Sequence, residues 1–315
     1  MRCVYRKKTS AFALLLALLL LFSSCSLLSA PTTEGVTLTD VLGREVTVPE
    51  SPARVAALLG SFADVWTLAG GTVVAATTDA YREYGVPGEG AVDLGGAHSP
   101  SLEALISADP DLVLASASTA SHVALCDTLE AMGIPVLYFE VDHFDDYLAM
   151  LKTCTALTGR EDLYDLYGTR LKAEIDTIRA ATLALPEKEK RILLLRASSG
   201  AVKAKGSDGT VLGEMLASVG CTNIADGDGT LLEQLSVEEV IRREPYRIFI
   251  VTMGSDTQTA IASVERMLAQ DPAWRSLSAV REGRVHYMER ALYNSKPNDR
   301  WGEAYEKLYE ILKSP

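Results

Sequence analysis

Aromatic and basic side chains follow the predicted strands of this 315-residue chain at the points where the strands end. The side chains singled out as candidate ligand contacts are Tyr81, Arg82, Tyr84, His98, Arg196, Tyr293 and Arg300. In α/β proteins, ligands bind at the loops that follow the carboxyl ends of the strands, and the loops expected here include residues 78–84 and 290–294. Aromatic rings pack on flat ligand rings, and guanidinium groups neutralise ligand carboxylates. The pattern predicts a small-molecule site with Lys203 and Lys205 on a positive rim; the alternative is solvated loop side chains.

Metal binding by side chains is not predicted. The chain has four histidines, which form no HxH or HExxH pattern: His98, His122, His143 and His286. A lone His98 or Met253 is at most a candidate axial ligand for haem iron. The sequence therefore predicts no metal site and no resident cofactor.

Nucleophilic catalysis is not predicted either. Ser61 stands in Gly-Ser-Phe-Ala, which lacks the second glycine of a GxSxG nucleophile elbow. The Gly206-Gly209 stretch lacks the Lys-Ser/Thr ending of a phosphate-binding loop. We expect no catalytic residue and no enzyme activity, and we keep a secreted hydrolytic enzyme as the alternative.

The N-terminus has the architecture of a secretory signal. Four basic residues within positions 2–8 precede an apolar run at 11–22, and Ser23, Ser24 and Cys25 follow. The ending resembles the lipobox of bacterial lipoproteins, in which the Cys becomes the lipidated first residue; here Phe22 stands where that pattern has Leu. The expectation is a signal peptide over 1–25, a lipid (palmitate-type) anchor on Cys25 and an extracytoplasmic location.

Charge and composition exclude other classes. Hydrophobic residues make up 48% of the chain and charged residues 23%, which is typical of a folded protein. Removal of residues 1–25 takes four positive charges and changes the net charge from −12 to −16. Such an acidic body is a poor general nucleic-acid binder. A membrane contact through the lipid alone is expected, because anionic headgroups repel the body.

Three cysteines remain after the signal. Cys126, Cys154 and Cys221 are widely spaced and form no CxxC motif, so neither a zinc ribbon nor a redox motif is indicated. The prediction is buried thiols, with one disulfide left open as an alternative.

Strand and helix patterns alternate along the chain. A tether over 26–35 leads into a β-hairpin over 36–48, and apolar strand runs at 55–59, 73–76, 112–115 and 134–139 alternate with helices at 61–69, 101–107 and 119–132. Helices are predicted at 144–157 and, as one long rod, at 161–183. The same alternation recurs after residue 190. This pattern predicts two α/β lobes with mostly parallel sheets.

Several phrases resemble those of a known family. They are LTDVLGREVTVPESPARVAAL and LGGAHSPSLEALISADPDLVLAS in the first half, and LLEQLSVEEVIRREPYRIFIVTMG, DPAWRSLSAVREGRVHYM and KPNDRWGEAYEKLYEIL in the second. In this order they resemble the class III substrate-binding proteins of ABC importers, which carry ferric siderophores, haem or cobalamin.

The resemblance implies two Rossmann-like lobes joined by one long helix, with the ligand between the lobes. The corresponding expectation places the N-terminal lobe at 36–158, the linking helix at 159–186 and the C-terminal lobe at 187–315. The implied partners are an ABC permease with its ATPase and a small-molecule metal chelate, and the protein is expected to be a monomer. A surface scaffold protein without a transport role is a further alternative.

The resemblance also implies permease-docking acids, one on each lobe. The matching positions are Glu103 in SPSLEAL and Glu238 in LSVEEV, with Glu239 as a rival for Glu238. Each stands near a Ser at the start of a predicted helix, where the helix dipole favours a carboxylate and the Ser is a candidate cap. Arg–carboxylate pairs would orient the two surfaces.

Overall fold

The computed structural model of the protein describes residues 35–254 and 256–314. They begin with the predicted hairpin, in which strand β1 (Gly35–Thr39) pairs antiparallel with β2 (Glu45–Pro49). The Asp40 carboxylate accepts hydrogen bonds from the backbone N–H groups of Leu42 and Arg44, both at 3.0 Å, and so closes the turn. The predicted signal peptide, Cys25 and most of the tether lie outside the described residues.

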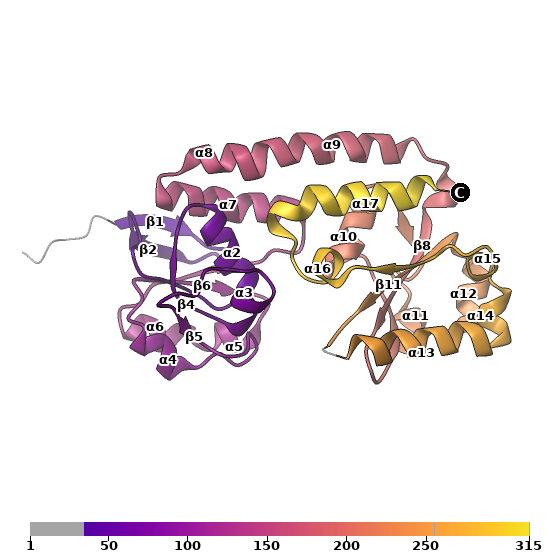
Figure 1. Cartoon of the computed structure of the whole chain (residues 1–315), viewed down its shortest axis with the longest axis horizontal. Coiled ribbons are helices and arrows are strands. Elements are labelled where there is room, and N and C mark those ends of the chain that lie inside the picture. The colour runs from indigo at the N-terminus through magenta and orange to yellow at the C-terminus, as the bar shows by residue number, and fades with distance from the viewer. Residues whose placement is uncertain (1–34, 255, 315) are drawn as a thin grey trace, which may run out of the picture. The chain divides into compact units, whose positions relative to one another are not determined.

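The first lobe, drawn in indigo to magenta in Figure 1, is built on a five-stranded parallel sheet. The strand order is β5-β4-β3-β6-β7. Its strands are β3 (Val55–Ala57), β4 (Val73–Ala76), β5 (Val92–Asp93), β6 (Leu112–Ser116) and β7 (Val136–Phe139). The strand residues are largely buried, as expected for a parallel sheet covered on both faces. The continuous apolar runs in the sequence follow from this burial.

Helices connect these strands. They are α2 (Gly60–Leu68), α3 (Thr78–Arg82), α4 (Leu102–Ser107), α5 (Ala120–Val123), α6 (Cys126–Ala131) and α7 (Phe144–Thr158). The prediction of a loop over 78–84 was wrong, because α3 occupies most of it. The prediction of one helix over 119–132 was also wrong: the His122 carbonyl accepts from Leu125 N–H at 3.1 Å and from the Tyr138 hydroxyl at 2.8 Å, which ends α5.

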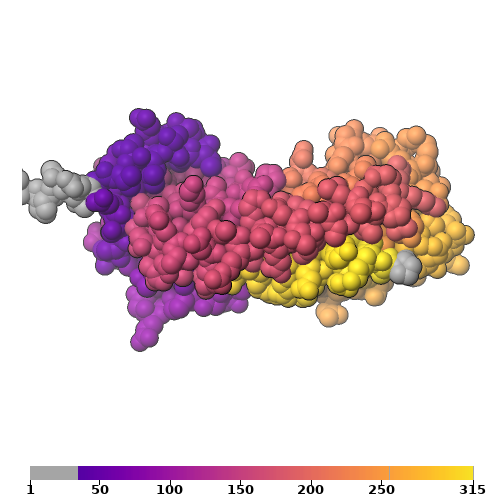
Figure 2. Space-filling model, turned by 90° about the horizontal axis from the view of Figure 1, so that it is seen from above, coloured from indigo at the N-terminus to yellow at the C-terminus, as the bar shows by residue number. Residues whose placement is uncertain are grey.

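A long helical segment links the two halves of the chain. It consists of α8 (Glu161–Tyr164), the π-helical turn η1 (Asp165–Thr169) and α9 (Arg170–Leu183). The predicted rod over 161–183 is therefore present, but the π turn interrupts its regular hydrogen bonding. Figure 2 shows α9 of this segment side by side with the C-terminal helix α17 (Trp301–Lys313).

The second lobe contains another mainly parallel sheet, with the order β10-β8-β11-β12. Its strands are β8 (Arg191–Ala197), β9 (Val202–Lys205), β10 (Thr222–Asn223), β11 (Arg247–Thr252) and β12 (Val285–Met288). Strand β9 forms an antiparallel hairpin with β8, and the sequence analysis did not predict it. Its sequence, VKAK, is too short and too charged to be distinguished from a loop.

The remaining helices surround this second sheet. They are the 3-10 turns η2 (Glu187–Lys190) and η3 (Asn298–Arg300) and the helices α10 (Val211–Ser218), α11 (Gly229–Gln234), α12 (Val237–Arg243), α13 (Thr257–Gln270), α14 (Pro272–Ser276), α15 (Ser278–Arg281) and α16 (Arg290–Tyr293). The loop expected over 290–294 is largely the helix α16.

One apolar cluster spans both lobes. It combines the inner faces of the two sheets, such as Leu114 of β6 and Leu194 of β8, with residues of α7, α9 and α17. Alternate residues of the same strands, such as Val113 and Leu195, belong to separate clusters on the outer faces. Because one continuous core joins the two sheets, the lobes pack directly against each other and are not connected by a flexible linker alone.

The chain is thus a mixed α/β protein with two parallel-sheet lobes, which confirms the predicted fold class. The lobe boundaries at 158 and 187 stay a prediction, since the described residues from Gly35 onward form one compact unit. Cys126, Cys154 and Cys221 are free thiols. Among the described residues, no helix combines the length and apolar character needed to cross a membrane.

Candidate functional site: a cleft between the two lobes

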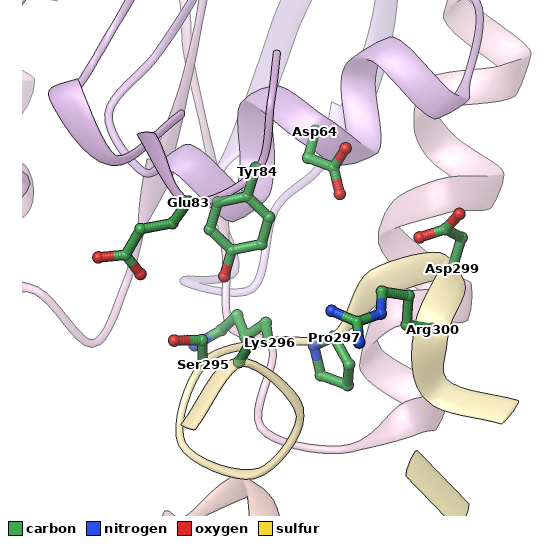
Figure 3. A pocket seen from close by; sticks show the side chains of 9 residues that line it. Asp64, Glu83, Tyr84, Ser295, Lys296, Pro297, Asp299 and Arg300 are labelled. Atoms are coloured by element: carbon green, nitrogen blue, oxygen red, sulfur yellow. The ribbon is translucent and has the colours of Figure 1, made fainter. Parts of the chain in front are cut away.

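Two adjoining cavities lie between the first lobe and the segment that follows β12. The larger has a volume of about 470 Å³ and the smaller about 220 Å³. They share Glu83, Tyr84, Ser295 and Lys296. Figure 3 shows the smaller cavity, with the Tyr84 hydroxyl pointing across it toward Ser295 and Lys296. Cavities of this size, between lobes and at strand ends, are typical of small-molecule sites.

Segments at the carboxyl ends of parallel strands provide most of the first-lobe wall. Helix α3 and the residues after it follow β4 and carry Arg82 and Tyr84, and the loop after β5 carries His98. The Asp79 carboxylate accepts a hydrogen bond from the Gly60 N–H at 2.8 Å, which ties α3 to the start of α2. The wall is therefore fixed by the connections of the sheet.

Asn298 anchors the opposite wall. Its amide donates to the Ser61 carbonyl at 2.9 Å and to the Asp64 carboxylate at 2.7 Å, so the second-lobe segment is fastened to α2. Asn298 is buried and has a φ of 52°, a left-handed conformation that Asn tolerates better than most residues. This junction lies beside the cleft, because the neighbouring Pro297 and Asp299 line the smaller cavity.

Charged groups in the cleft are partly desolvated. Burial raises the pKa of Asp64 to about 6, and the nearby Asp299 carboxylate adds to this rise while the hydrogen bond from Asn298 opposes it. Burial also raises the pKa of Asp299 and lowers the pKa of Lys296. Arg290 reaches across to Glu83 at 3.4 Å. The cleft therefore offers both signs of charge at reduced hydration.

The structure brings four of the seven predicted contacts to the cavities. Arg82 and His98 line the larger cavity, Arg300 lines the smaller one, and Tyr84 lines both. Their role in binding stays a prediction.

The other three predicted contacts lie outside the cavity walls. Tyr293 is buried behind the wall, and its hydroxyl donates to the Ala304 carbonyl at 2.9 Å. The Tyr81 hydroxyl donates to the Val92 carbonyl at 3.3 Å. Arg196 lies at the end of β8. Tyr293 was expected on a loop, but α16 turns it inward into the core.

Several polar residues of the walls were not predicted from the sequence. They are Asp64, Asp79, Glu83, Arg290, Lys296 and Asp299. Lys296 and Asp299 belong to KPND, a polar interruption directly before the last amphipathic helix, and that interruption was the available signal. Asp64 lies within α2 and carried no such signal, because only the packing of Asn298 against it shows its role.

Three cations gather at the end of β8. Arg196 is paired with Lys203 in the β8–β9 register, and Lys205 follows two residues later on the same side. Within the described residues, none of the three forms a salt bridge. Burial lowers the pKa of Lys205, and Arg196 and Lys203 lower it further. We call Arg196, Lys203 and Lys205 the basic cluster.

The basic cluster lies on the cleft side of the second sheet. Leu194, two residues before Arg196 on β8, belongs to the apolar cluster between the lobes, so Arg196 is on that same face. Strands β11 and β12 follow β8 in the sheet, and Arg290, which comes just after β12, lines the larger cavity. At about 4.8 Å between strands, Arg196 lies about 10 Å from Met288, the residue in register with it on β12, and Arg290 comes two residues after Met288.

The two predicted docking acids occupy equivalent places. Glu103 lies in the first turn of α4 and Glu238 in the first turn of α12; both are exposed, and each comes two residues after a Ser that caps its helix. The rival Glu239 is bound by Arg242 and Arg243, which lower its pKa to about 2. Glu238 is therefore the more available of the two neighbours.

The candidate nucleophile Ser61 and the candidate haem ligand Met253 do not form a second functional site. Ser61 is buried at the start of α2, and Met253 is exposed after β11. Among the described residues, no group of three His, Cys, Asp or Glu side chains is placed to hold a metal ion. Another cavity of about 330 Å³ lies away from the cleft, lined by His143, Glu214 and Trp301 among others.

Comparison with known proteins assigns the class. Residues 51–292 match the sequence profile of the family described as "Periplasmic binding protein". The chain is 23% identical over 308 residues to a Bacillus subtilis (strain 168) protein named as ABC transporter substrate-binding lipoprotein YhfQ, covering 91% of this chain and 92% of that protein.

Two solved structures share the fold. The siderophore-binding protein BauB, bound to two acinetobactin molecules and ferric iron, matches with a TM-score of 0.70 and 19% identity over 89% of this chain and 99% of that chain. Staphylococcus aureus IsdE complexed with haem matches with a TM-score of 0.66 and 14% identity over 83% and 99%.

The chain therefore belongs to the periplasmic binding protein family. It is a binding protein and not an enzyme, as predicted. The family match also confirms the resemblance to substrate-binding proteins that the sequence phrases indicated.

The raised pKa of Asp64 predicts a pH effect on stability. A carboxyl whose folded pKa lies above its unfolded value of about 4 binds its proton more tightly in the folded state, so folding is favoured as pH falls through about 6. The free energy of unfolding, measured with urea, should gain about 2 kcal/mol from this group between pH 7 and pH 4.5. Asp64→Asn should lose that gain, while the exposed Asp127→Asn should keep it. Equal pH profiles for wild type and Asp64→Asn would contradict the assignment.

Proposed function

We propose that the protein is an extracytoplasmic substrate-binding protein of an ABC importer, which captures an iron chelate (a siderophore) or a haem- or cobalamin-type ligand in the cleft. The observation that carries this proposal is the pair of adjoining cavities between the lobes, with the basic cluster on the same edge of the second sheet. The name of YhfQ supports an ABC importer as the partner, and the ligands bound by BauB and IsdE support a siderophore or haem as the ligand class. The protein acts as a monomer that delivers its ligand to a permease driven by an ATPase.

The charge of the ligand follows from the basic cluster. Three neighbouring cations in a chain of net charge −12 repel one another, and burial of Arg196 and Lys205 adds to that cost. A ligand with several carboxylate or catecholate oxygens relieves this repulsion by binding among them. An anionic chelate is therefore favoured over a neutral one, and Tyr84 offers an aromatic face for its rings.

Binding of a probe panel tests the ligand class. Protein lacking residues 1–25 should bind ferric enterobactin or haemin with micromolar or better affinity in calorimetric titrations. The variant Arg196→Gln/Lys203→Gln/Lys205→Gln should bind that anionic probe about 10 to 100-fold more weakly, since each lost charge contact is worth about 0.5–1 kcal/mol. The effect should shrink at high salt.

The control for this panel removes the same charge elsewhere. Lys152→Gln/Lys188→Gln/Arg266→Gln alters three exposed cations and should bind as wild type does. Preferential binding of neutral cyanocobalamin, unaffected by the first variant, would refute an anionic ligand. No binding to any siderophore, haem or cobamide probe would refute the substrate class.

Docking on the permease is assigned to Glu103 and Glu238. They lie on different lobes and in the same helical position, so two matched carboxylates are available to two basic pockets of a two-subunit permease. Glu103→Ala/Glu238→Ala should lower uptake of the bound chelate by cells at least tenfold and leave the affinity of the purified protein unchanged. The matched pair Glu161→Ala/Glu306→Ala should import normally. Wild-type uptake by the first pair would refute docking.

The membrane anchor is assigned to Cys25. The lipobox-like ending at residues 22–25 and the naming of YhfQ as a lipoprotein support it. Cys25→Ser should move the protein from the membrane fraction to the medium or periplasm and from the detergent phase to the aqueous phase in Triton X-114 partitioning. Cys3→Ser, which alters a Cys inside the signal, should remain membrane-bound. Membrane retention of both variants would contradict lipidation.

A further inference from the structure

His122 is a fully buried polar side chain close to the cleft, and it lines neither of the two cavities. It lies in α5 with 0% exposure. Its Nδ1 accepts a hydrogen bond from the Ser116 N–H at 3.2 Å, and its Nε2 lies 2.6 Å from the Ala97 carbonyl oxygen. A backbone N–H only donates and a carbonyl only accepts, so the proton must sit on Nε2. The two contacts define one neutral tautomer.

These contacts join three segments that are far apart in the sequence. Ser116 is the last residue of β6, Ala97 belongs to the loop after β5, and the Tyr138 hydroxyl of β7 donates to the His122 carbonyl at 2.8 Å. Strand β5 is at one edge of the sheet and β7 at the other. His122 therefore ties the loop after the edge strand to the centre of the sheet.

The loop held in this way is a wall of the cleft. Gly96, Ala97 and His98 line the cavity of about 470 Å³. Gly96 and His98 are exposed, and β5 itself is only two residues long. At its start the loop is also held by the Thr78 N–H, which donates to the Gly95 carbonyl at 2.8 Å. From Gly96 onward the other backbone bonds are short-range, such as that from the Ser99 N–H to the Gly96 carbonyl at 2.9 Å. The bond to His122 is a side-chain bond that reaches the loop from a distant part of the chain.

We infer that His122 is a positioning residue of the binding cleft: its imidazole holds the Gly96–His98 loop against the end of β6 and so fixes the wall that carries His98. The effect on ligand binding rests on the proposed function. The effect on the loop does not.

The tautomer makes this contact sensitive to pH. A second proton on the ring would set an Nδ1–H against the Ser116 N–H in a buried site, and both donors would lack an acceptor. Burial lowers the pKa of His122, and the nearby His98 lowers it further, whereas the Ala97 carbonyl and the Asp79 carboxylate oppose the shift. The contact should hold at neutral pH and weaken as pH falls well below 6.5.

Amide hydrogen exchange of residues 95–101 tests the positioning directly, without a ligand. His122→Asn keeps an acceptor for Ser116 but is too short to reach Ala97, and exchange in this segment should be at least tenfold faster than in wild type. His122→Gln restores a donor at the distance of Nε2 and should recover most of the protection. His143→Asn, at an exposed histidine outside this contact, should exchange as wild type does. Equal exchange in wild type and His122→Asn would overturn the inference.

Ligand titration then tests the consequence for the cleft. Haemin and ferric enterobactin are the probes, and whichever binds wild type should bind His122→Asn at least fivefold more weakly and His122→Gln nearly normally. Wild-type affinity should fall between pH 7 and pH 5, whereas that of His122→Gln should change less. Faster loop exchange with unchanged affinity and pH profile would overturn the role in binding. Failure of wild type to bind any siderophore, haem or cobamide probe would refute the proposed ligand class, and the exchange result would still decide the positioning.

Discussion

The shared apolar core between the two sheets is the constraint on which the site depends. Each sheet has its own core on the outer face, but the inner faces meet in one cluster through α7, α9 and α17. Trp301, at the start of α17, is buried in this cluster and contacts Phe144 of α7 edge to face at 5.8 Å between ring centroids. The two walls of the cleft are thereby held at a defined separation before any ligand arrives.

A preformed cleft changes the energetics of capture. Binding does not have to offset the entropy lost when flexible segments become ordered, so a few contacts are enough for useful affinity. The segment Ser295–Arg300 is central to this arrangement, because it leaves α16, places Lys296 in the cleft and bonds to α2 through Asn298 before α17 begins. Desolvation of the cleft charges strengthens their interaction with a charged ligand. The same desolvation explains why the pKa values of Asp64 and Lys296 move toward neutrality.

Much of the fold could be predicted from the sequence. Buried parallel strands appear as continuous apolar runs, and these runs alternate regularly with segments of helical periodicity. The hairpin at 35–49, most strands and the long rod after Gly159 follow from such patterns. The points at which helices end could not be predicted. Helix α5 ends where the Tyr138 hydroxyl donates a hydrogen bond to the His122 carbonyl, and Tyr138 belongs to a strand later in the sequence.

The site was predictable only in part for the same reason. Arg82, Tyr84 and His98 come after strand ends and do line the cavities, and Arg300 lines the smaller cavity from the turn η3. Tyr293 follows a strand end too, but a short helix turns it into the core. Asp64 and Asn298 lie more than 200 residues apart, and only the folded chain shows that one binds the other. Local sequence patterns report strand ends well and long-range pairs poorly.

The position of the ligand is measured most directly by locating the metal in a crystal of the protein grown with the anionic chelate that it binds. Anomalous scattering at the iron edge should give one peak between Tyr84 and Lys296, within the cleft that their side chains share. A peak in the separate cavity beside His143 and Trp301, or on the surface outside both lobes, would contradict the account.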